Sequence, residues 1–166
     1  GPDSTALMHL AARWAAARAE PVPIVVLTVD HGLRAASRAE AEAVAAAAAR
    51  LNLPHEILTW AGPKPASDIQ AEARTARYGL LAAAARRHGA DRLLTGHTRD
   101  DQAETVLLAL ARGSGLYGLA AMPAERQLDP GLTLVRPFLC LPKSRLVATL
   151  RAAGIGWIED PSNEDP

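Results

Sequence analysis

Several residue types and patterns are scarce in this chain of 166 residues. Its one cysteine, Cys140, excludes an internal disulfide and a two-cysteine metal or redox motif. Aromatic residues make up only 4% of the sequence, which argues against an RNA-binding surface built on stacked rings. The 18 basic and 18 acidic residues cancel, so overall charge does not hold this chain to nucleic acid. No run approaches the ~20 apolar residues of a membrane span, and we expect no membrane partner.

What the chain has instead is a regular alternation of apolar strands with Ala-rich helices. This alternation predicts an α/β fold with a doubly wound, mostly parallel, Rossmann-like sheet in one domain over residues 1–166. We expect strands over 23–30, 55–60, 91–96 and part of 132–139; helices over 4–19, 37–51, 67–88, 99–111 and 143–153; and irregular structure over 116–130. Ligands of such sheets bind beyond the carboxyl ends of the strands.

The chain opens with GPDST, a Gly-Pro pair followed by residue types that begin helices. A helix N-terminus offers free N–H groups and a partial positive charge, and it therefore binds phosphate. The candidates for this role are Gly1, Pro2, Asp3 and Ser4. Ser4 is placed to donate to a phosphate oxygen, and Asp3 to hold Mg²⁺ directly or through water. The plainer interpretation is that Asp3 or Ser4 only caps the helix.

The stretch VDHGLR ends a strand whose unbroken apolar run is typical of a parallel sheet. Asp30 and His31 stand where that strand ends, and Gly32 permits a sharp turn. This position suits a nucleotide contact. Asp and Gly are also ordinary turn residues, so a plain loop is the alternative interpretation.

The most informative stretch is GHTRDDQAETVLLALARGSG, residues 96–115. Gly96 and His97 follow a predicted strand, where His97 contacts a nucleotide or simply caps the next helix. Within that helix, one face carries an apolar stripe made of Ala103, Val106, Leu107 and Leu110.

Carboxylates occupy another face of the same predicted helix. Glu104 lies four residues after Asp100 and three after Asp101, so the three side chains are neighbours. Acidic residues in the first turn suit the helix dipole, which is a sufficient explanation by itself. Three carboxylates also repel one another, and a bound cation or amine would relieve that repulsion.

The stretch EARTARYGLL places two arginines within one turn of a predicted helix. Arg77 and, one turn earlier, Arg74 are candidates for phosphate or AMP contacts, because guanidinium binds phosphate bidentately. The alternative is a solvated face on which Glu72 is the partner.

Taken together, these stretches resemble the N-terminal catalytic domain of the tRNA(Ile)-lysidine synthetases, within the PP-loop ATP pyrophosphatase superfamily. GPDS matches the last four positions of that family's S-G-G-x-D-S loop. The other matching stretches, in the family's order, are VDHGLR, GHTRDDQAETVLLALARGSGLYGLAAM, RPFL at Arg136 and EDPSN at Glu159. They span nearly the whole chain, and the GHTRDDQAET stretch is the most specific of them.

The resemblance implies a ligase that uses ATP and Mg²⁺, free L-lysine and tRNA(Ile) with a CAU anticodon. The wobble cytidine's C2 oxygen would attack the α-phosphate and release pyrophosphate; the lysine ε-amine would then attack C2 and expel AMP. On this resemblance Asp101 is the leading lysine-binding residue, with Glu104 and Asp100 beside it. One of these carboxylates would take the amine's proton, and Asp3 would serve catalysis at the phosphates. The resemblance also implies a cytoplasmic enzyme, and a homodimer is left open.

The sequence departs from the family at its ends. It has no counterpart of the start of the phosphate loop, of the strand before that loop, or of the C-terminal tRNA-binding domains. We therefore expect that the sequence is trimmed at both ends. Three alternatives are a 2-thiolation enzyme of the same superfamily, a nucleotide-binding piece without activity, and a plain RNA-binding protein. The single cysteine counts against the first, and the neutral charge with few aromatics against the last.

Overall fold

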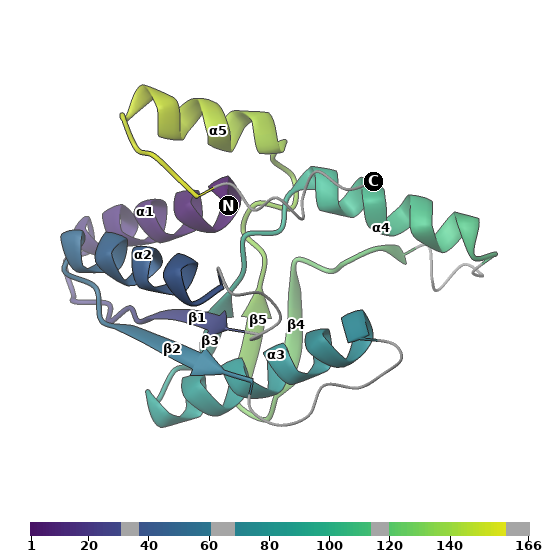
Figure 1. The fold of residues 1–166 in the computed structure, drawn as a ribbon, viewed down its shortest axis with the longest axis horizontal. Helices are drawn as coiled ribbons and strands as arrows, with labels where there is room; N and C mark the ends of the chain where they lie inside the picture. The colour runs from purple at the N-terminus through teal and green to yellow at the C-terminus, as the bar shows by residue number, and fades with distance from the viewer. Residues whose placement is uncertain (31–36, 61–68, 114–119, 159–166) are drawn as a thin grey trace. The chain divides into compact units, whose positions relative to one another are not determined.

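A computed structural model of the chain describes residues 1–30, 37–60, 69–113 and 120–158. Helices and strands alternate along it, as predicted for the α/β class (Figure 1). In chain order the elements are α1 (Pro2–Ala16), β1 (Val26–Asp30), α2 (Ser37–Arg50), β2 (His55–Thr59), α3 (Ile69–Arg87), β3 (Arg92–Leu94), α4 (Arg99–Ala111), β4 (Glu125–Asp129), β5 (Leu132–Val135) and α5 (Lys143–Ala152).

The chain divides into two compact units. Unit 1 comprises Gly1–Leu7, Leu94–Leu128 and Thr133–Pro166, and unit 2 comprises Met8–Leu93 and Asp129–Leu132. Among the described helices, none is long and apolar enough to cross a membrane.

Unit 2 is built on the parallel pair β1 and β2. The register runs from Val26 opposite His55 to Asp30 opposite Thr59. Helix α2 connects the two strands and packs against both, and α3 packs against β1. Parallel strands need such a crossover because the end of one strand and the start of the next lie at opposite edges of the sheet. The predicted parallel pairing is therefore confirmed for these two strands.

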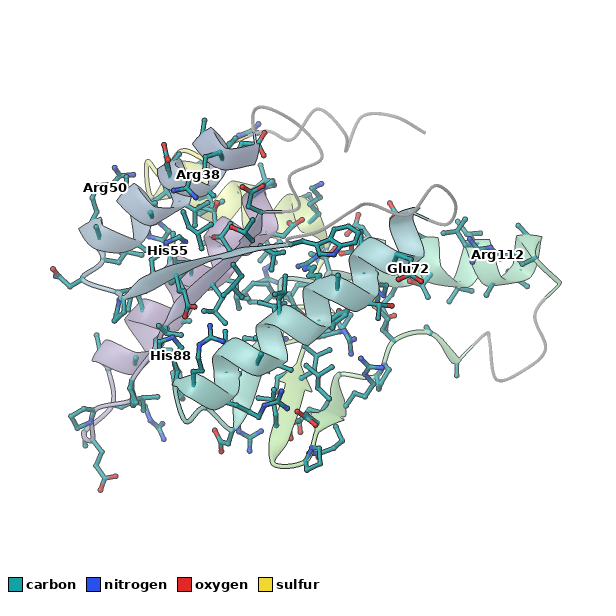
Figure 2. The ribbon with its side chains drawn as sticks, turned by 60° about the horizontal axis from the view of Figure 1, so that its bottom comes forward. Arg38, Arg50, His55, Glu72, His88 and Arg112 are labelled. Carbon is teal, nitrogen blue, oxygen red and sulfur yellow. The ribbon has the colours of Figure 1, made fainter. Side chains whose placement is uncertain are left out.

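Small side chains let the helices of unit 2 approach their neighbours closely. Ala48 of α2 and Ala84 of α3 are each 0% exposed, and Leu58 of β2 is 6% exposed. The alanine content that predicted helix therefore also supplies part of the buried core. Figure 2 shows α3 with Glu72 near its start and His88 just beyond its end.

Three helices end with the same backbone hydrogen bonds. The N–H of the residue after Gly89 returns to Ala85, and the N–H of the residue after Gly154 returns to Leu150. Both glycines have φ of +65°, and Asn52 plays the same part after α2 with φ of 55°. This left-handed residue after the last turn is favourable for glycine and tolerated by asparagine. The sequence signals for these helix ends are confirmed.

The prediction for residues 116–130 was wrong. Residues 116–130 were expected to be irregular, yet β4 occupies Glu125–Asp129 and forms a sheet in the order β3-β5-β4. Pro130 and Gly131, with φ of 78° at the glycine, join β4 to β5 as a hairpin. A two-residue connection requires antiparallel strands, so this second sheet is not purely parallel. Strand β4 is an edge strand whose polar sequence ERQLD shows no apolar alternation, and the pattern therefore missed it.

Helix α4 has the predicted bounds but not a buried face. Leu107, Leu108 and Leu110 are 64%, 54% and 54% exposed, and none of the residues of α4 is buried. Helical spacing shows which residues share a face, but it cannot show whether a neighbouring element covers that face.

Candidate functional site

The first turn of α1 begins two residues earlier than the sequence predicted. Pro2 is the first helical residue, a position that proline favours because its missing N–H would have no partner there. The hydroxyls of Ser4 and Thr5 donate to the carbonyl of Gly1, at 3.2 and 2.9 Å. Asp3 and Ser4 therefore lie inside the first turn and are not its cap. Their backbone N–H groups belong to the set that binds anions at helix starts.

Gly96 lies directly against this turn. A side chain at Gly96 would place its Cβ 3.0 Å from the backbone carbon and oxygen of Asp3 and 3.2 Å from the nitrogen of Ser4. A Cβ at these distances would push the backbone of Asp3 and Ser4 back by a few tenths of an ångström, so glycine lets the loop before α4 pack this closely on the start of α1. The structure thus brings together two segments that lie more than ninety residues apart in the sequence.

The carboxylate of Asp3 has an incomplete set of partners. Its Oδ1 is buried and has no hydrogen-bond partner among the described residues. Its Oδ2 lies 4.0 Å from the Nζ of Lys143. Burial raises the pKa of Asp3 above its usual value, and nearby Asp101 and Asp100 add to the rise while Lys143 opposes it. A buried carboxylate in this state favours a proton or a cation.

Asp101 has a structural role at the start of α4. Its Oδ2 accepts hydrogen bonds from the backbone N–H and the hydroxyl of Thr98, at 2.6 and 2.7 Å. Thr98 is the residue before the helix and is 1% exposed, so this arrangement is a capping box with Asp at its third helical position. One carboxylate oxygen of Asp101 therefore stabilises the helix start, as the plainer interpretation of this residue predicted.

The other two predicted carboxylates of α4 differ from each other. Oδ2 of Asp100 accepts a hydrogen bond of 2.8 Å from the backbone N–H of Lys143 and so joins α4 to the first turn of α5. Glu104 is exposed, one helical turn beyond Asp101. Asp100 is exposed as well, whereas Asp101 is half-buried, so a ligand from solution reaches Asp100 and Glu104 more readily than Asp101.

His97 is held in place by its neighbour. Its Nδ1 lies 2.9 Å from the hydroxyl of Thr95, which is 6% exposed. This contact fixes the ring at the end of β3, beside Gly96. Thr98, not His97, is the capping residue of α4, so the alternative interpretation of His97 as the cap is wrong. A nucleotide contact of His97 stays a prediction.

The remaining predicted site residues belong to unit 2. Asp30 ends β1 and is 8% exposed. The guanidinium of Arg74 lies over the ring of Tyr78, 5.3 Å from its centroid, and Arg77 is exposed one turn along α3. The Arg74–Tyr78 contact is a cation–π interaction, which gives Arg74 a structural use beside the predicted phosphate contact. His31 lies outside the described residues.

Two structural residues were missed by the sequence analysis. The amide of Gln102 donates to the carbonyl of Met122 at 2.7 Å and accepts from its N–H at 2.8 Å. Arg136, 3% exposed, donates to the carbonyl of Pro123 at 2.8 Å. Together these side chains hold the segment that follows α4. Both lie in stretches that the resemblance singled out, DDQAET and RPFL, and that membership was the available signal.

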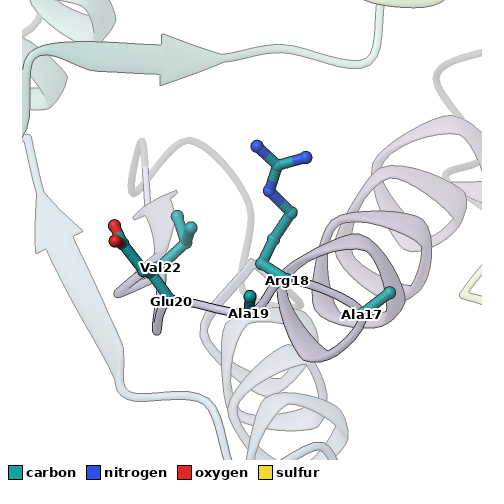
Figure 3. A pocket seen from close by; sticks show the side chains of 5 residues that line it. All are labelled: Ala17, Arg18, Ala19, Glu20 and Val22. Carbon is teal, nitrogen blue, oxygen red and sulfur yellow. The ribbon is translucent and has the colours of Figure 1, made fainter.

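No group of three or more His, Cys, Asp or Glu side chains within the described ranges is arranged to hold a metal ion. A surface hollow, drawn in Figure 3, lies beyond the end of α1 and is lined by Ala17, Arg18, Ala19, Glu20 and Val22. None of the predicted site residues lines it.

The chain is similar to known proteins over its whole length. The chain is 58% identical to the tRNA(Ile)-lysidine synthase of Rhodopseudomonas palustris over 166 residues, which are 100% of this chain and 48% of that protein. It is 58% identical to the Methylobacterium nodulans synthase, covering 99% of this chain and 47% of that protein. With the Mesorhizobium japonicum synthase the identity is 45%, covering 99% and 37%. The chain spans about half the length of the first two relatives.

Among solved structures, the chain is similar to the U34-tRNA thiolase NcsA from Methanococcus maripaludis with its [4Fe-4S] cluster. The TM-score is 0.82 at 15% sequence identity, over 97% of this chain and 57% of that one, which shows a shared fold. The family model described as the PP-loop domain matches residues 1–166, the whole sequence, and the chain therefore belongs to the PP-loop family.

Proposed function

We propose that the protein containing this chain ligates lysine to C2 of the wobble cytidine of tRNA(Ile), with ATP as the source of activation. The observation that carries the proposal is identity of up to 58% to tRNA(Ile)-lysidine synthases across 100% of the chain. The site in unit 1 supports it, because a helix N-terminus and a cluster of carboxylates meet there. The tRNA with a CAU anticodon, free L-lysine, a homodimer and a cytoplasmic location belong to this proposal.

The phosphates of ATP would lie at the start of α1. The first-turn N–H groups around Asp3 and Ser4 are of the kind that binds anions, and Gly96 packs closely against the backbone of the same turn. His97, in unit 1, and Asp30, His31, Arg74 and Arg77, in unit 2, stay predictions as nucleotide contacts.

Asp3 suits Mg²⁺ better as one ligand among phosphates than as part of a protein cage. Its Oδ1 is buried without a hydrogen-bond partner among the described residues, and Mg²⁺ in nucleotide sites takes one or two carboxylates together with phosphate oxygens. The ion would neutralise charge that develops on the phosphates. Asp3 would hold the ion and keep the phosphates at the helix N-terminus.

The reaction would proceed in two transfers. The cytidine C2 oxygen attacks the α-phosphorus and pyrophosphate leaves; the ε-amine of lysine then attacks C2 and AMP leaves with the oxygen. The amine must lose a proton to become a nucleophile, and a carboxylate of α4 would accept it. Glu104 and Asp100 are both exposed, but one oxygen of Asp100 already accepts from the backbone N–H of Lys143, and one oxygen of Asp101 accepts from Thr98. Asp100 and Asp101 would supply negative charge for the ammonium group.

The test is release of AMP and pyrophosphate from α-labelled ATP by the intact protein, with unmodified tRNA(Ile). Release that requires both lysine and this tRNA supports the proposal. Release without lysine points to another tRNA modification of the superfamily, and ATP binding without release to a nucleotide-binding protein. The structural neighbour is a thiolase with a [4Fe-4S] cluster. The one cysteine of this chain cannot hold such a cluster by itself.

A further inference from the structure

Lys143, the first residue of α5, touches the candidate site twice. Its backbone N–H donates to Oδ2 of Asp100 at 2.8 Å, and its Nζ lies 4.0 Å from Oδ2 of Asp3. The hydrogen bond from the backbone N–H to Asp100 does not depend on the side chain at position 143. The ammonium group of Lys143 is therefore not needed to join α5 to α4. The charge of Lys143 therefore has a separate role, and Asp3 is the group it faces.

The interaction between Lys143 and Asp3 is weak enough to be exchanged. A distance of 4.0 Å is the limit for an ion pair, and the two side chains are 42% and 24% exposed. Exposed pairs of this kind add little to stability. Asp3 still has one buried oxygen without a hydrogen-bond partner among the described residues, and Asp100 and Asp101 add like charge around it. One ammonium therefore offsets only part of the negative charge around Asp3, and a divalent cation at Asp3 would offset more of it.

We propose that Lys143 is an exchangeable counter-ion of Asp3 that becomes a phosphate-binding residue. Without nucleotide the ammonium faces Asp3; when Mg²⁺ and ATP bind, Mg²⁺ takes that place and the ammonium turns to the phosphate oxygens. The four-carbon stem of lysine allows this movement, and its ammonium binds phosphate as a point charge. The role rests on the proposed function, because it requires that ATP bind at the start of α1.

The test measures two affinities that should change in opposite directions. In Lys143→Met, removal of the competing ammonium should tighten binding of Mn²⁺, a paramagnetic substitute for Mg²⁺, in the absence of nucleotide. The same variant should bind ATP with Mg²⁺ about tenfold more weakly, the effect of losing one charge-assisted contact. Paramagnetic resonance would follow free Mn²⁺, and calorimetry would follow ATP.

The matched control is Arg145→Met, which removes the same charge from the exposed face of the same helix turn. Neither affinity should change in it, whereas Lys143→Arg should recover part of the ATP affinity. A melting curve identifies any variant that fails to fold, and Lys143→Gln then replaces it. Two affinities that move together, or not at all, would overturn the role of Lys143. Wild-type protein that binds no ATP would overturn this role and the proposed function together.

Discussion

The carboxylate of Asp101 has a structural contact in addition to its proposed role in binding lysine. Its Oδ2 accepts two hydrogen bonds from Thr98 and so holds the first turn of α4. The same residue is the predicted lysine-binding carboxylate, so any change at Asp101 alters the helix start as well as the ligand. Glu104 shares the face of α4 but is exposed, and it offers the cleaner test.

We expect Glu104→Gln to weaken use of lysine without loss of stability. The substitution removes the charge that attracts an ammonium and the oxygen that accepts its proton, so kcat/KM for lysine should fall at least tenfold. Asp101→Asn should lower kcat/KM as well, but also cost about 1 kcal/mol of stability because its cap is weakened. Steady-state kinetics at varied lysine and urea unfolding measure the two effects.

Thr98→Val is the control, since it removes one of the donors to Asp101 but no carboxylate. It should lower stability and leave the KM for ATP unchanged. Equal loss of lysine use in Thr98→Val and Glu104→Gln would show that the geometry of α4, rather than its charge, governs the reaction.

Among the elements, α4 and β4 show what the sequence can and cannot predict. Helix α4 has the predicted bounds, and in the structure Thr98 caps its start while Gly113, with φ of +65°, follows its end. Strand β4 was missed because an edge strand needs no apolar alternation. The contact of Gly96 with Asp3 and that of Lys143 with Asp100 join residues far apart in sequence. No local pattern contains such pairs, so the resemblance found the segments but not their partners.

Gln102 links α4 to the segment that follows it, and we predict that Gln102→Glu breaks this link. A carboxylate still accepts from the N–H of Met122 but cannot donate to its carbonyl, which leaves two oxygens facing each other. The lost hydrogen bond and the unpaired carbonyl should together cost about 1–3 kcal/mol in the free energy of unfolding. Urea denaturation measures the loss, and a stability equal to that of wild type would contradict the assignment.

In unit 2, Glu56 links β2 to the end of α3. It accepts hydrogen bonds from Arg87 and His88, which hold the pKa of Glu56 below its usual value. A carboxylate with a lowered pKa in the folded state stabilises the fold at pH above its unfolded pKa. This stabilisation is lost as the pH falls through the folded value.

Glu56→Gln should therefore reduce the difference in stability between neutral pH and pH values below the usual glutamate range. The measurement is urea unfolding across that range, compared with Glu42→Gln, whose partner Arg38 lies one turn away on the exposed face of α2. An unchanged pH dependence in Glu56→Gln would show that the link adds nothing to stability.

At the scale of the whole molecule, the balance of charge sets what this chain can do with tRNA. Its 18 basic and 18 acidic residues leave no net charge to attract a phosphate backbone. Each phosphate contact that a protein makes steepens the dependence of affinity on salt, because counterions are released. For the proposed binding of tRNA, a neutral PP-loop domain would depend on a few local contacts.

We expect this 166-residue chain by itself to bind tRNA(Ile) weakly and with little preference over another tRNA. Because few phosphates would be contacted, the slope of log affinity against log salt should be shallow, about two or less in magnitude. Filter binding with the two tRNAs across a salt series measures the slope and the preference together. A steep slope would reveal a concentrated basic surface, whereas a strong preference with a shallow slope would place recognition of the anticodon within this domain.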